Sequence, residues 1–285
     1  MSSDSKGGTP KDSHYARLRR AHRERTGGSE RGPAAPRRPQ VAPSAPADGT
    51  VRLYGLHTVR AALDNPRRRI LRLLVTRNAL ARLGLKEPLD LPFPADIVEP
   101  REIDALLGSD AVHQGVAIEA APLTPKPLAA LGDERLVLVL DQVTDPHNVG
   151  AIMRSAVAFG AGALITTERH SPVESGVLAK SASGALEHID HIHVRNLAEA
   201  LAELSRAGFQ TLGLDSEGPA ELEKTFSGDR IALVLGAEGK GLRQKTRQTV
   251  TALARLELPG AIHSLNVSNA AAVALYAACL HLDRV

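Results

Sequence analysis

The sequence predicts an α/β protein in two folded parts, the second built around a mostly parallel sheet. From Arg135 onward, short apolar strands alternate with helical segments. One of these strands, Leu136–Leu140, is continuously apolar, which is expected when helices cover both faces of the sheet. The length of 285 residues also exceeds the ~100–200 residues usual for a single domain.

The composition is that of a globular chain, with 43% hydrophobic and 24% charged residues. It excludes a collagen-like, fully disordered or disulfide-scaffold protein. The single cysteine, Cys279, cannot form an internal disulfide or a cysteine-based zinc site, and it is expected to pack in the core. No apolar run approaches the ~18–20 residues of a membrane span, and no secretory signal is visible. A cytoplasmic protein without membrane contact is the default expectation.

Residues 1–50 are expected to form a disordered basic tail. Residues 1–47 hold ten Lys and Arg against four Asp and Glu, whereas residues 48–285 carry a net charge of −3. The segment is rich in Pro, Gly, Ser and Arg and offers almost nothing to bury. Such an arm suits a polyanion such as RNA. It can also serve solubility alone, or reflect a start site set too far upstream.

Residues 51–120 are predicted to form a small α/β domain that begins with Val51–Tyr54 and a turn at Gly55. Pro100 suits the first turn of a helix, and the last segment alternates as a half-buried strand. The further expected segments are helix Leu56–Leu63, strand Ile70–Thr76, helix Asn78–Leu83, extended Ile97–Val98, helix Pro100–Leu107 and strand Val112–Glu119.

A proline-marked linker, residues 121–134, leads to the second domain, residues 135–285. The expected strands are Leu136–Leu140, Ala163–Thr167, His191–Val194, Phe209–Leu214, Ile231–Leu235 and Ala254–Leu258. The expected helices are Asn148–Gly160, Pro172–Ala182, Leu197–Ala207, Leu242–Thr246 and Asn266–Leu282. Ligands of such sheets bind outside the carboxyl ends of the strands, so three strand-to-loop junctions are of interest.

The first junction, residues 141–156, passes from a strand through a polar loop into a helix. Asn148 is a candidate N-cap for that helix. Arg154 lies about two turns inside it, among Val, Ala, Ile and Met, and is expected to be at least partly covered. A solvated charge is the bland interpretation of Arg154; the other junctions favour a functional one.

The second junction, Leu235–Leu242, places three glycines after an apolar strand. Glycine permits positive φ and close approach of the backbone to a ligand. The spacing matches neither a Rossmann nor a Walker motif, so a tight turn remains an alternative.

The third junction, residues 258–269, holds Ser264, Asn266, Ser268 and Asn269, which are more polar residues than a helix cap requires.

Other candidate sites are weaker. His191 and His193 share one face of a strand, so a metal site is conceivable, but a surface strand is favoured. No hydrolase motif of the G-x-S-x-G or H-E-x-x-H type occurs.

Together the three junctions resemble the SpoU branch of the SPOUT superfamily, the S-adenosylmethionine-dependent RNA 2'-O-ribose methyltransferases. The matching segments are Asn148–Arg154, Leu235–Gly239 and Ser264–Ser268, in the family's order. The segment Tyr54–Leu63 is similar to the start of the family's substrate-binding domain. The two-domain layout is most similar to the bacterial enzymes that methylate guanosine riboses of 23S rRNA. The loop from Pro259 to Ser264 is about two residues shorter than the family's usual loop.

This resemblance implies a C-terminal trefoil knot, an exception to the rule that chains do not thread loops. It implies a homodimer with sites at the subunit interface, S-adenosylmethionine as cofactor, RNA as partner and no metal. The cofactor contacts fall on Gly236, Leu258 and Leu265. The catalytic positions fall on Asn148, Arg154, Glu238, Ser264 and Asn266.

The family's favoured base is the arginine at position 154. A guanidinium rarely gives up its proton, because its pKa lies above ~12. Arg154 therefore acts either as a base activated by a nearby phosphate and apolar cover, or as a clamp on the forming alkoxide. Glu238 is a candidate to orient Arg154, while Ser264 and Asn266 suit a ribose.

Two other functions remain open. A tRNA ribose methyltransferase would share the motifs, although the domain at 51–120 favours rRNA. A non-catalytic RNA-binding protein of this fold would be expected to lose Arg154, Glu238 or Asn266, and all three are present.

The charge distribution predicts that the tail adds affinity without sequence choice. Deleting residues 1–47 should weaken RNA binding and flatten its dependence on salt, because fewer counterions are released. The methylated nucleotide should stay the same. Filter binding over a salt series and mapping of the modified nucleotide check both points, and a changed target would show that the tail reads sequence.

Overall fold

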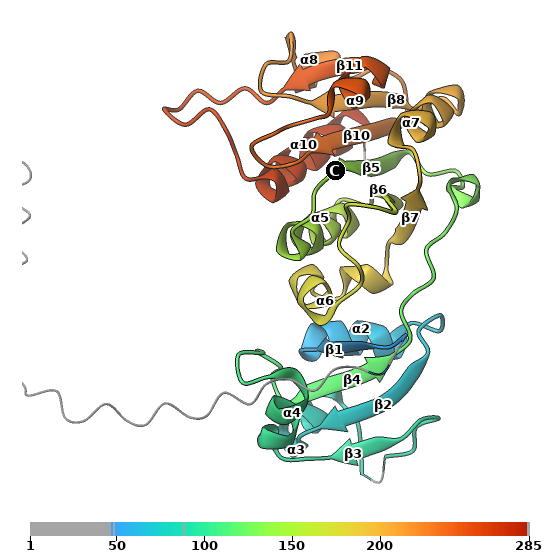
Figure 1. Ribbon diagram of the computed structural model, residues 1–285, viewed down its shortest axis with the longest axis vertical. Coiled ribbons are helices and arrows are strands. Elements are labelled where there is room, and N and C mark those ends of the chain that lie inside the picture. The colour runs from blue at the N-terminus through green and yellow to red at the C-terminus, as the bar shows by residue number, and fades with distance from the viewer. Residues whose placement is uncertain (1–46, 48, 88, 284–285) are drawn as a thin grey trace, which may run out of the picture. The chain divides into compact units, whose positions relative to one another are not determined.

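The computed structural model describes residues 47–283 except Asp48 and Pro88, so the predicted tail lies almost wholly outside the described residues. The N-terminal part is a four-stranded sheet in the order β1-β4-β2-β3, with β4 antiparallel to both neighbours (Figure 1). Its elements are β1 (Val51–Tyr54), α2 (Leu56–Asp64), β2 (Ile70–Val75), α3 (Arg77–Leu83), β3 (Ala95–Ile97), α4 (Pro100–Leu107) and β4 (Val116–Ala120).

Most of the small domain's elements lie where the sequence predicts them, and their ends have local causes. Gly55 precedes α2 with a φ of 91°, and Thr76 ends β2 by capping α3. The strand predicted over Val112–Glu119 is wrong at its start, because it begins only at Val116. Gln114 and Gly115 have φ values of 58° and 82°, so the chain turns there instead of extending.

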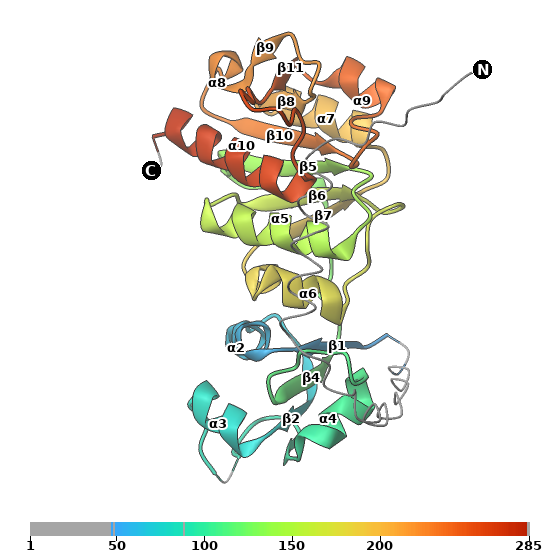
Figure 2. The same ribbon diagram turned by 90° about the vertical axis from the view of Figure 1, so that its left-hand side faces the viewer.

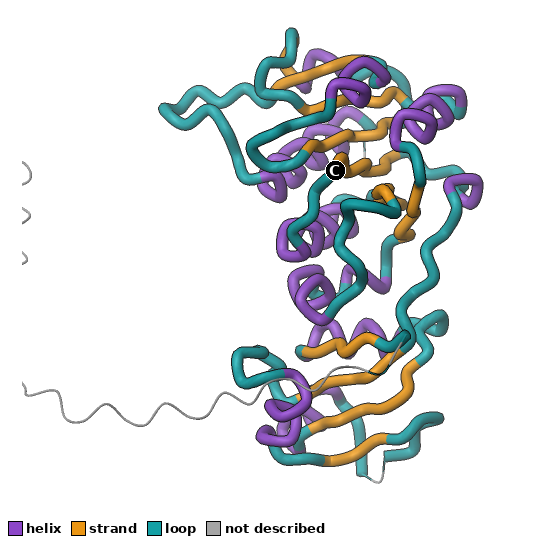
Figure 3. Tube along the Cα trace, in the orientation of Figure 1, coloured by secondary structure: helices purple, strands orange, loops and turns teal. Residues whose placement is uncertain are grey.

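The C-terminal part is a seven-stranded sheet in the order β7-β6-β5-β10-β8-β11-β9, with every pair parallel (Figures 1 and 3). Its strands are β5 (Leu136–Asp141), β6 (Ala163–Thr167), β7 (Asp190–Val194), β8 (Gln210–Leu214), β9 (Ala220–Glu221), β10 (Ile231–Gly236) and β11 (Ala252–Arg255). Strand β5 is buried along its whole length, as its unbroken apolar run predicts.

The helices of this part differ from expectation mainly at their ends. Helix α6 begins at Gly176 and not at Pro172, because Ser175 caps it by accepting from Leu178 N. Asn148 is not an N-cap: Asp145 caps α5 by accepting from His147 N at 2.9 Å. The helices are η1 (Leu128–Ala130), α5 (Pro146–Ala158), α6 (Gly176–Ala182), η2 (Ala185–Glu187), α7 (Leu197–Arg206), α8 (Leu222–Thr225), α9 (Gln244–Thr249) and α10 (Val267–His281).

Helices cover both faces of the parallel sheet. Helices α5 and α10 lie on one face and α7 on the other (Figure 2). Leu136, Leu138 and Leu140 of β5 belong to the core on the first face, and Val137 and Val139 belong to the core on the second. Cys279 lies in the first of these cores, where its thiol donates to Phe159 O at 3.1 Å, so its predicted structural role is confirmed. Among the described residues no helix is long and apolar enough to cross a bilayer.

A buried arginine joins the two sheets. Arg68, in the loop between α2 and β2, has a side chain with no exposed surface, and its guanidinium lies 2.5 Å from Glu187 Oε1 and 2.5 Å from Glu174 Oε1. It also donates to Ala121 O at 3.0 Å. Burial raises the pKa of Glu174 despite the nearby charge of Arg68, which shows that desolvation of this group is not fully offset. We call Arg68, Glu174 and Glu187 the arginine clamp.

The arginine clamp predicts that replacing Arg68 destabilises the protein far more than replacing its neighbour Arg67. Arg68→Met should lower the free energy of unfolding by about 3–5 kcal/mol, because it leaves two carboxylates buried without their cation. Arg67→Met is the control: Arg67 pairs with Asp190 at the surface, and its loss should cost only about 0–1 kcal/mol. Urea unfolding of both variants measures the difference, and equal midpoints would contradict it.

Candidate functional site

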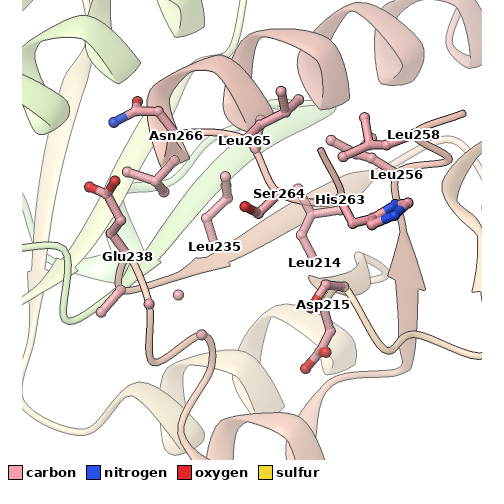
Figure 4. Close-up of a pocket in the computed structure, with 17 residues that line it drawn as sticks. Leu214, Asp215, Leu235, Glu238, Leu256, Leu258, His263, Ser264, Leu265 and Asn266 are labelled. Atoms are coloured by element: carbon pink, nitrogen blue, oxygen red, sulfur yellow. The ribbon is translucent and has the colours of Figure 1, made fainter. Parts of the chain in front are cut away.

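A cavity of about 470 Å³ opens at the carboxyl ends of β8 and β10, beside the loop that follows β11 (Figure 4). Gly236, Leu258 and Leu265, the predicted cofactor contacts, all line it. Glu238, Ser264 and Asn266 line it as well. The second and third junctions therefore meet at one hollow, as the strand-end rule predicts.

The second junction folds back on itself as a tight loop. Gly241 N donates to Ala237 O at 2.8 Å, and Gly239 and Gly241 have φ values of 76° and 65° that favour glycine. A side chain on Gly236 would overlap the backbone of Gly241 and Leu242. The glycine at 236 thus allows the backbone of the loop, and not a ligand, to approach the end of β10 closely.

A buried carboxylate anchors this loop to the first junction. Parallel pairing sets Asp141, the last residue of β5, opposite Gly236 of β10. Asp141 is fully buried, and its two oxygens accept from Arg243 N at 3.0 Å and from Arg243 Nε at 2.6 Å. Asp141 is not among the site residues predicted from the sequence. A charged residue at the end of an unbroken apolar strand was the available signal.

Hydrogen bonds connect one side chain from each of the three junctions. Asn266 Nδ2 donates to Asn148 Oδ1 at 3.2 Å, and Asn148 Nδ2 donates to Glu238 Oε2 at 3.3 Å. Asn266 also caps α10, because its Oδ1 accepts from Ser268 N at 2.9 Å. We call Asn266, Asn148 and Glu238 the amide relay. The relay leaves Glu238 exposed and Asn148 and Asn266 partly exposed, so a bound molecule can reach them.

Comparison with known proteins decides the family. Residues 135–276 match the SpoU rRNA Methylase family, and residues 52–126 match the substrate-binding domain of RNA 2'-O ribose methyltransferases. The 23S rRNA (guanosine-2'-O-)-methyltransferase RlmB of Pseudomonas putida is 34% identical over 243 residues, 80% of this chain and 95% of the relative. The chain belongs to the SpoU rRNA methylase family. It is an RNA 2'-O-ribose methyltransferase.

Further relatives agree with this family. The RlmB of Acinetobacter baylyi is 37% identical over 79% of this chain and 95% of its own length. An RNA methyltransferase of the TrmH family from Porphyromonas gingivalis has 25% identity and a TM-score of 0.66 over 80% of this chain and 89% of that structure. The SpoU methyltransferase AviRb from Streptomyces viridochromogenes, at 21% identity and a TM-score of 0.69 over 82% and 90%, shares the fold.

Arg154 is exposed on α5. Glu238 bonds to Asn148 and not to Arg154, so the predicted orientation of Arg154 by Glu238 is not seen within one chain. Six residues along a helix turn the side chain by roughly 240° from Asn148, at ~3.6 residues per turn. Arg154 lines a separate hollow with His57, Arg60 and His188.

Several residues of the cavity were missed. Asp215 follows β8 directly and lies at the wall, where it pairs with Arg247. His263 lies on the same side of the cavity as Asp215 in Figure 4, away from Glu238. The remaining lining residues that the sequence analysis did not assign include Leu214, Ser216 and Leu256. The rule that ligands bind at strand ends would have found Leu214 and Asp215.

The histidine pair on β7 lies apart from this cavity. The rings of His191 and His193 are 4.3 Å apart, edge to face. Burial, helped by the charge of His193, lowers the pKa of His191 to about 3, so this ring is neutral at physiological pH. In the part of the chain that the structure describes, no three His, Cys, Asp or Glu residues are placed to hold a metal ion.

The bonds from Arg243 to Asp141 are expected to hold the loop at residues 237–243, which we call the glycine loop. Asp141→Asn should cost about 1.5–3 kcal/mol locally, because a bond to a charged group is lost, and should speed amide exchange in residues 237–243 by about 10- to 100-fold. Glu257→Gln, which breaks the surface pair with Arg255, should leave the loop unchanged. Hydrogen exchange by mass spectrometry compares them, and unchanged loop protection in Asp141→Asn would disprove the anchor.

Proposed function

We propose that this enzyme methylates the 2'-hydroxyl of a guanosine ribose in 23S rRNA, with S-adenosylmethionine as donor. The observation that carries the proposal is the amide relay, which gathers polar groups from all three family motifs beside one cavity. The names of the relatives, 23S rRNA (guanosine-2'-O-)-methyltransferase RlmB, support the choice of guanosine and rRNA.

The cavity suits the proposed donor in shape and chemistry. Its walls include leucines that fit an apolar ring, and the exposed carboxylate of Glu238 stands at its edge where a cation is favoured. Gly236, Leu258 and Leu265 would hold the donor, largely through backbone groups. When bound, the donor supplies a methyl group on a sulfonium sulfur.

The residues of this chain would then position the ribose. Ser264 and Asn266 have donor and acceptor atoms that fit its hydroxyls, and the relay fixes the amide of Asn266 through Asn148. Methyl transfer to the ribose oxygen would require loss of the hydroxyl proton, which would pass to Arg154 if this residue is the activated base, or to solvent if it is the clamp. Holding the oxygen in line with the departing sulfur lowers the barrier by up to about 7–11 kcal/mol in well-oriented cases.

Arg154 would complete the site from the partner subunit of a homodimer. Within one chain Arg154 does not line the cavity. Helix α10 exposes Val273, Tyr276 and Leu280 at 44–51%, and their spacing puts them on one face. An apolar stripe of this kind supports a subunit contact. Packing of two copies there would present Arg154 to the partner's cavity, as clamp or as activated base.

The finer features of the fold are part of the proposal. The two separate sheets support an RNA-binding domain at 51–120 and a methyltransferase domain at 135–285, joined by a linker at 121–134. The tail at 1–50 stays a prediction, because it lies almost wholly outside the described residues. A trefoil knot is what the family resemblance implies, and the packing of α10 against α5 and β10 supports it. Cytoplasmic location remains a prediction.

The two alternatives have less support. A tRNA ribose methyltransferase would use the same relay, and methylation assays on 23S rRNA and tRNA transcripts distinguish it. A non-catalytic RNA-binding protein is disfavoured because Asn148, Glu238 and Asn266 are all present and joined by hydrogen bonds.

Binding of S-adenosylmethionine tests the cavity. Gly239→Ala should weaken binding by about tenfold, because an alanine at positive φ costs about 1–2 kcal/mol in the loop that lines the cavity. Gly208→Ala is matched in strain, with a φ of 88° and open space around it, but lies in the turn before β8. Calorimetry should find parental affinity for Gly208→Ala, and equal losses in both variants would place the site elsewhere.

Arg154→Ala tests the chemical step. It should keep cofactor affinity within a few fold, while the single-turnover rate at saturating RNA falls by ~10²–10⁴. Arg154→Lys should also be poor, because a point charge cannot replace the planar guanidinium. Loss of cofactor binding with an unchanged single-turnover rate would make Arg154 a binding residue.

A further inference from the structure

A second hollow, of about 350 Å³, lies between the small domain and the methyltransferase domain. Four basic or titratable side chains line it: His57 and Arg60 from α2, Arg154 from α5, and His188 just after η2. All four are exposed, and one carboxylate, Asp64, lies among them. We call this hollow the junction groove. It is separate from the cavity beside the amide relay.

The floor of the groove is built from small buried residues, and the exposed charged side chains surround it. Ala61, Ala182 and Ala185 are buried there, together with Gly184. A side chain on Gly184 would stand 3.0 Å from Ala61 Cβ and 3.2 Å from His57 O, tighter than ordinary contacts. The glycine therefore allows the two domains to approach closely beneath the groove.

Both walls of the groove are fixed in place before any ligand arrives. Thr58 Oγ1, one residue after His57, donates to Ala179 O at 3.1 Å across a buried contact. His188 directly follows Glu187 of the arginine clamp, whose carboxylate is held by Arg68 and by Asn65. Binding there requires no domain movement, which lowers its cost.

The charges select the kind of ligand. Arg60 and Arg154 exceed Asp64 by one positive charge, and the imidazoles of His57 and His188 add further hydrogen-bonding groups. Phosphate oxygens suit guanidinium and imidazole donors of this kind. Because the groove is open and its exposed side chains are mainly basic, an extended polyanion fits better than an enclosed small molecule.

We propose that the junction groove binds a backbone phosphate of the substrate RNA, close to the target nucleotide. The proposal rests on the proposed function for its ligand and extends it to a site made jointly by both domains. The groove fixes the position of the strand, while the cavity beside the relay performs the transfer. Arg154 lines this groove and, in the proposed homodimer, would act at the cavity of the partner subunit.

The test uses the full-length protein, a 23S rRNA transcript and variants of the two opposite walls. Arg60→Gln should lower affinity for the transcript by about 3- to 10-fold and reduce the slope of log affinity against log salt by about one. His188→Gln, on the other wall, should also weaken binding. This variant leaves the hydrogen bond from Arg60 to Leu83 O intact, so its effect on RNA affinity does not depend on loss of that bond. Both variants should keep parental affinity for S-adenosylmethionine and a parental single-turnover rate at saturating RNA.

Arg206→Gln is the matched control, an exposed arginine at the end of α7 on the opposite face of the sheet. Parental RNA affinity and salt slope in both groove variants, as in Arg206→Gln, would overturn the proposal. Tight binding of inorganic phosphate to the groove without RNA, measured by calorimetry, would instead assign it to a free anion and also overturn it. A parent protein that binds S-adenosylmethionine but methylates no transcript would count against the proposed function and not against the groove.

Discussion

The site depends on the parallel pairing of β5 with β10. These strands are distant in sequence, yet their register sets Asp141 opposite Gly236, so the first two junctions leave the sheet side by side. The carboxylate of Asp141 then holds Arg243 and closes the glycine loop. Because β8 lies on the other side of β10, Asp215 reaches the same edge. The amide relay is a consequence of this strand order.

Much of this arrangement was predictable from the sequence. The apolar runs located the central strands within one or two residues, and the rule on strand ends brought Glu238, Ser264 and Asn266 to one place. Continuous apolar runs carry this information because a strand that is buried on both faces needs an apolar residue at nearly every position. The strand β9, only two residues long, and the short helix α8 after it were not predicted, because segments of that length show no period.

Other features depend on direction and partners, which a single sequence does not contain. Asp145 and Asn148 are both acceptable caps, and only the actual start of α5 at Pro146 decides between them. Arg154 points away from Asn148 because of helical rotation, so shared motif membership did not imply contact. Among Arg67, Arg68 and Arg69, only the middle side chain is buried, and the letters alone do not distinguish it. Its two carboxylate partners lie more than a hundred residues away.

That separation has a consequence for the order in which the protein is made. The strands of the small domain pair only with one another, so its sheet is complete once Ala120 has been synthesised. Arg68 then waits for Glu174 and Glu187, which follow it by 106 and 119 residues. Glu174 and Glu187 follow Ala120 by 54 and 67 residues, so at ~5–20 residues per second the delay after the sheet is complete is roughly 3–13 seconds. For that interval the nascent small domain carries a hydrated arginine on the face that later docks, so a newly made chain passes through a stage in which its RNA-binding half is folded and still unattached.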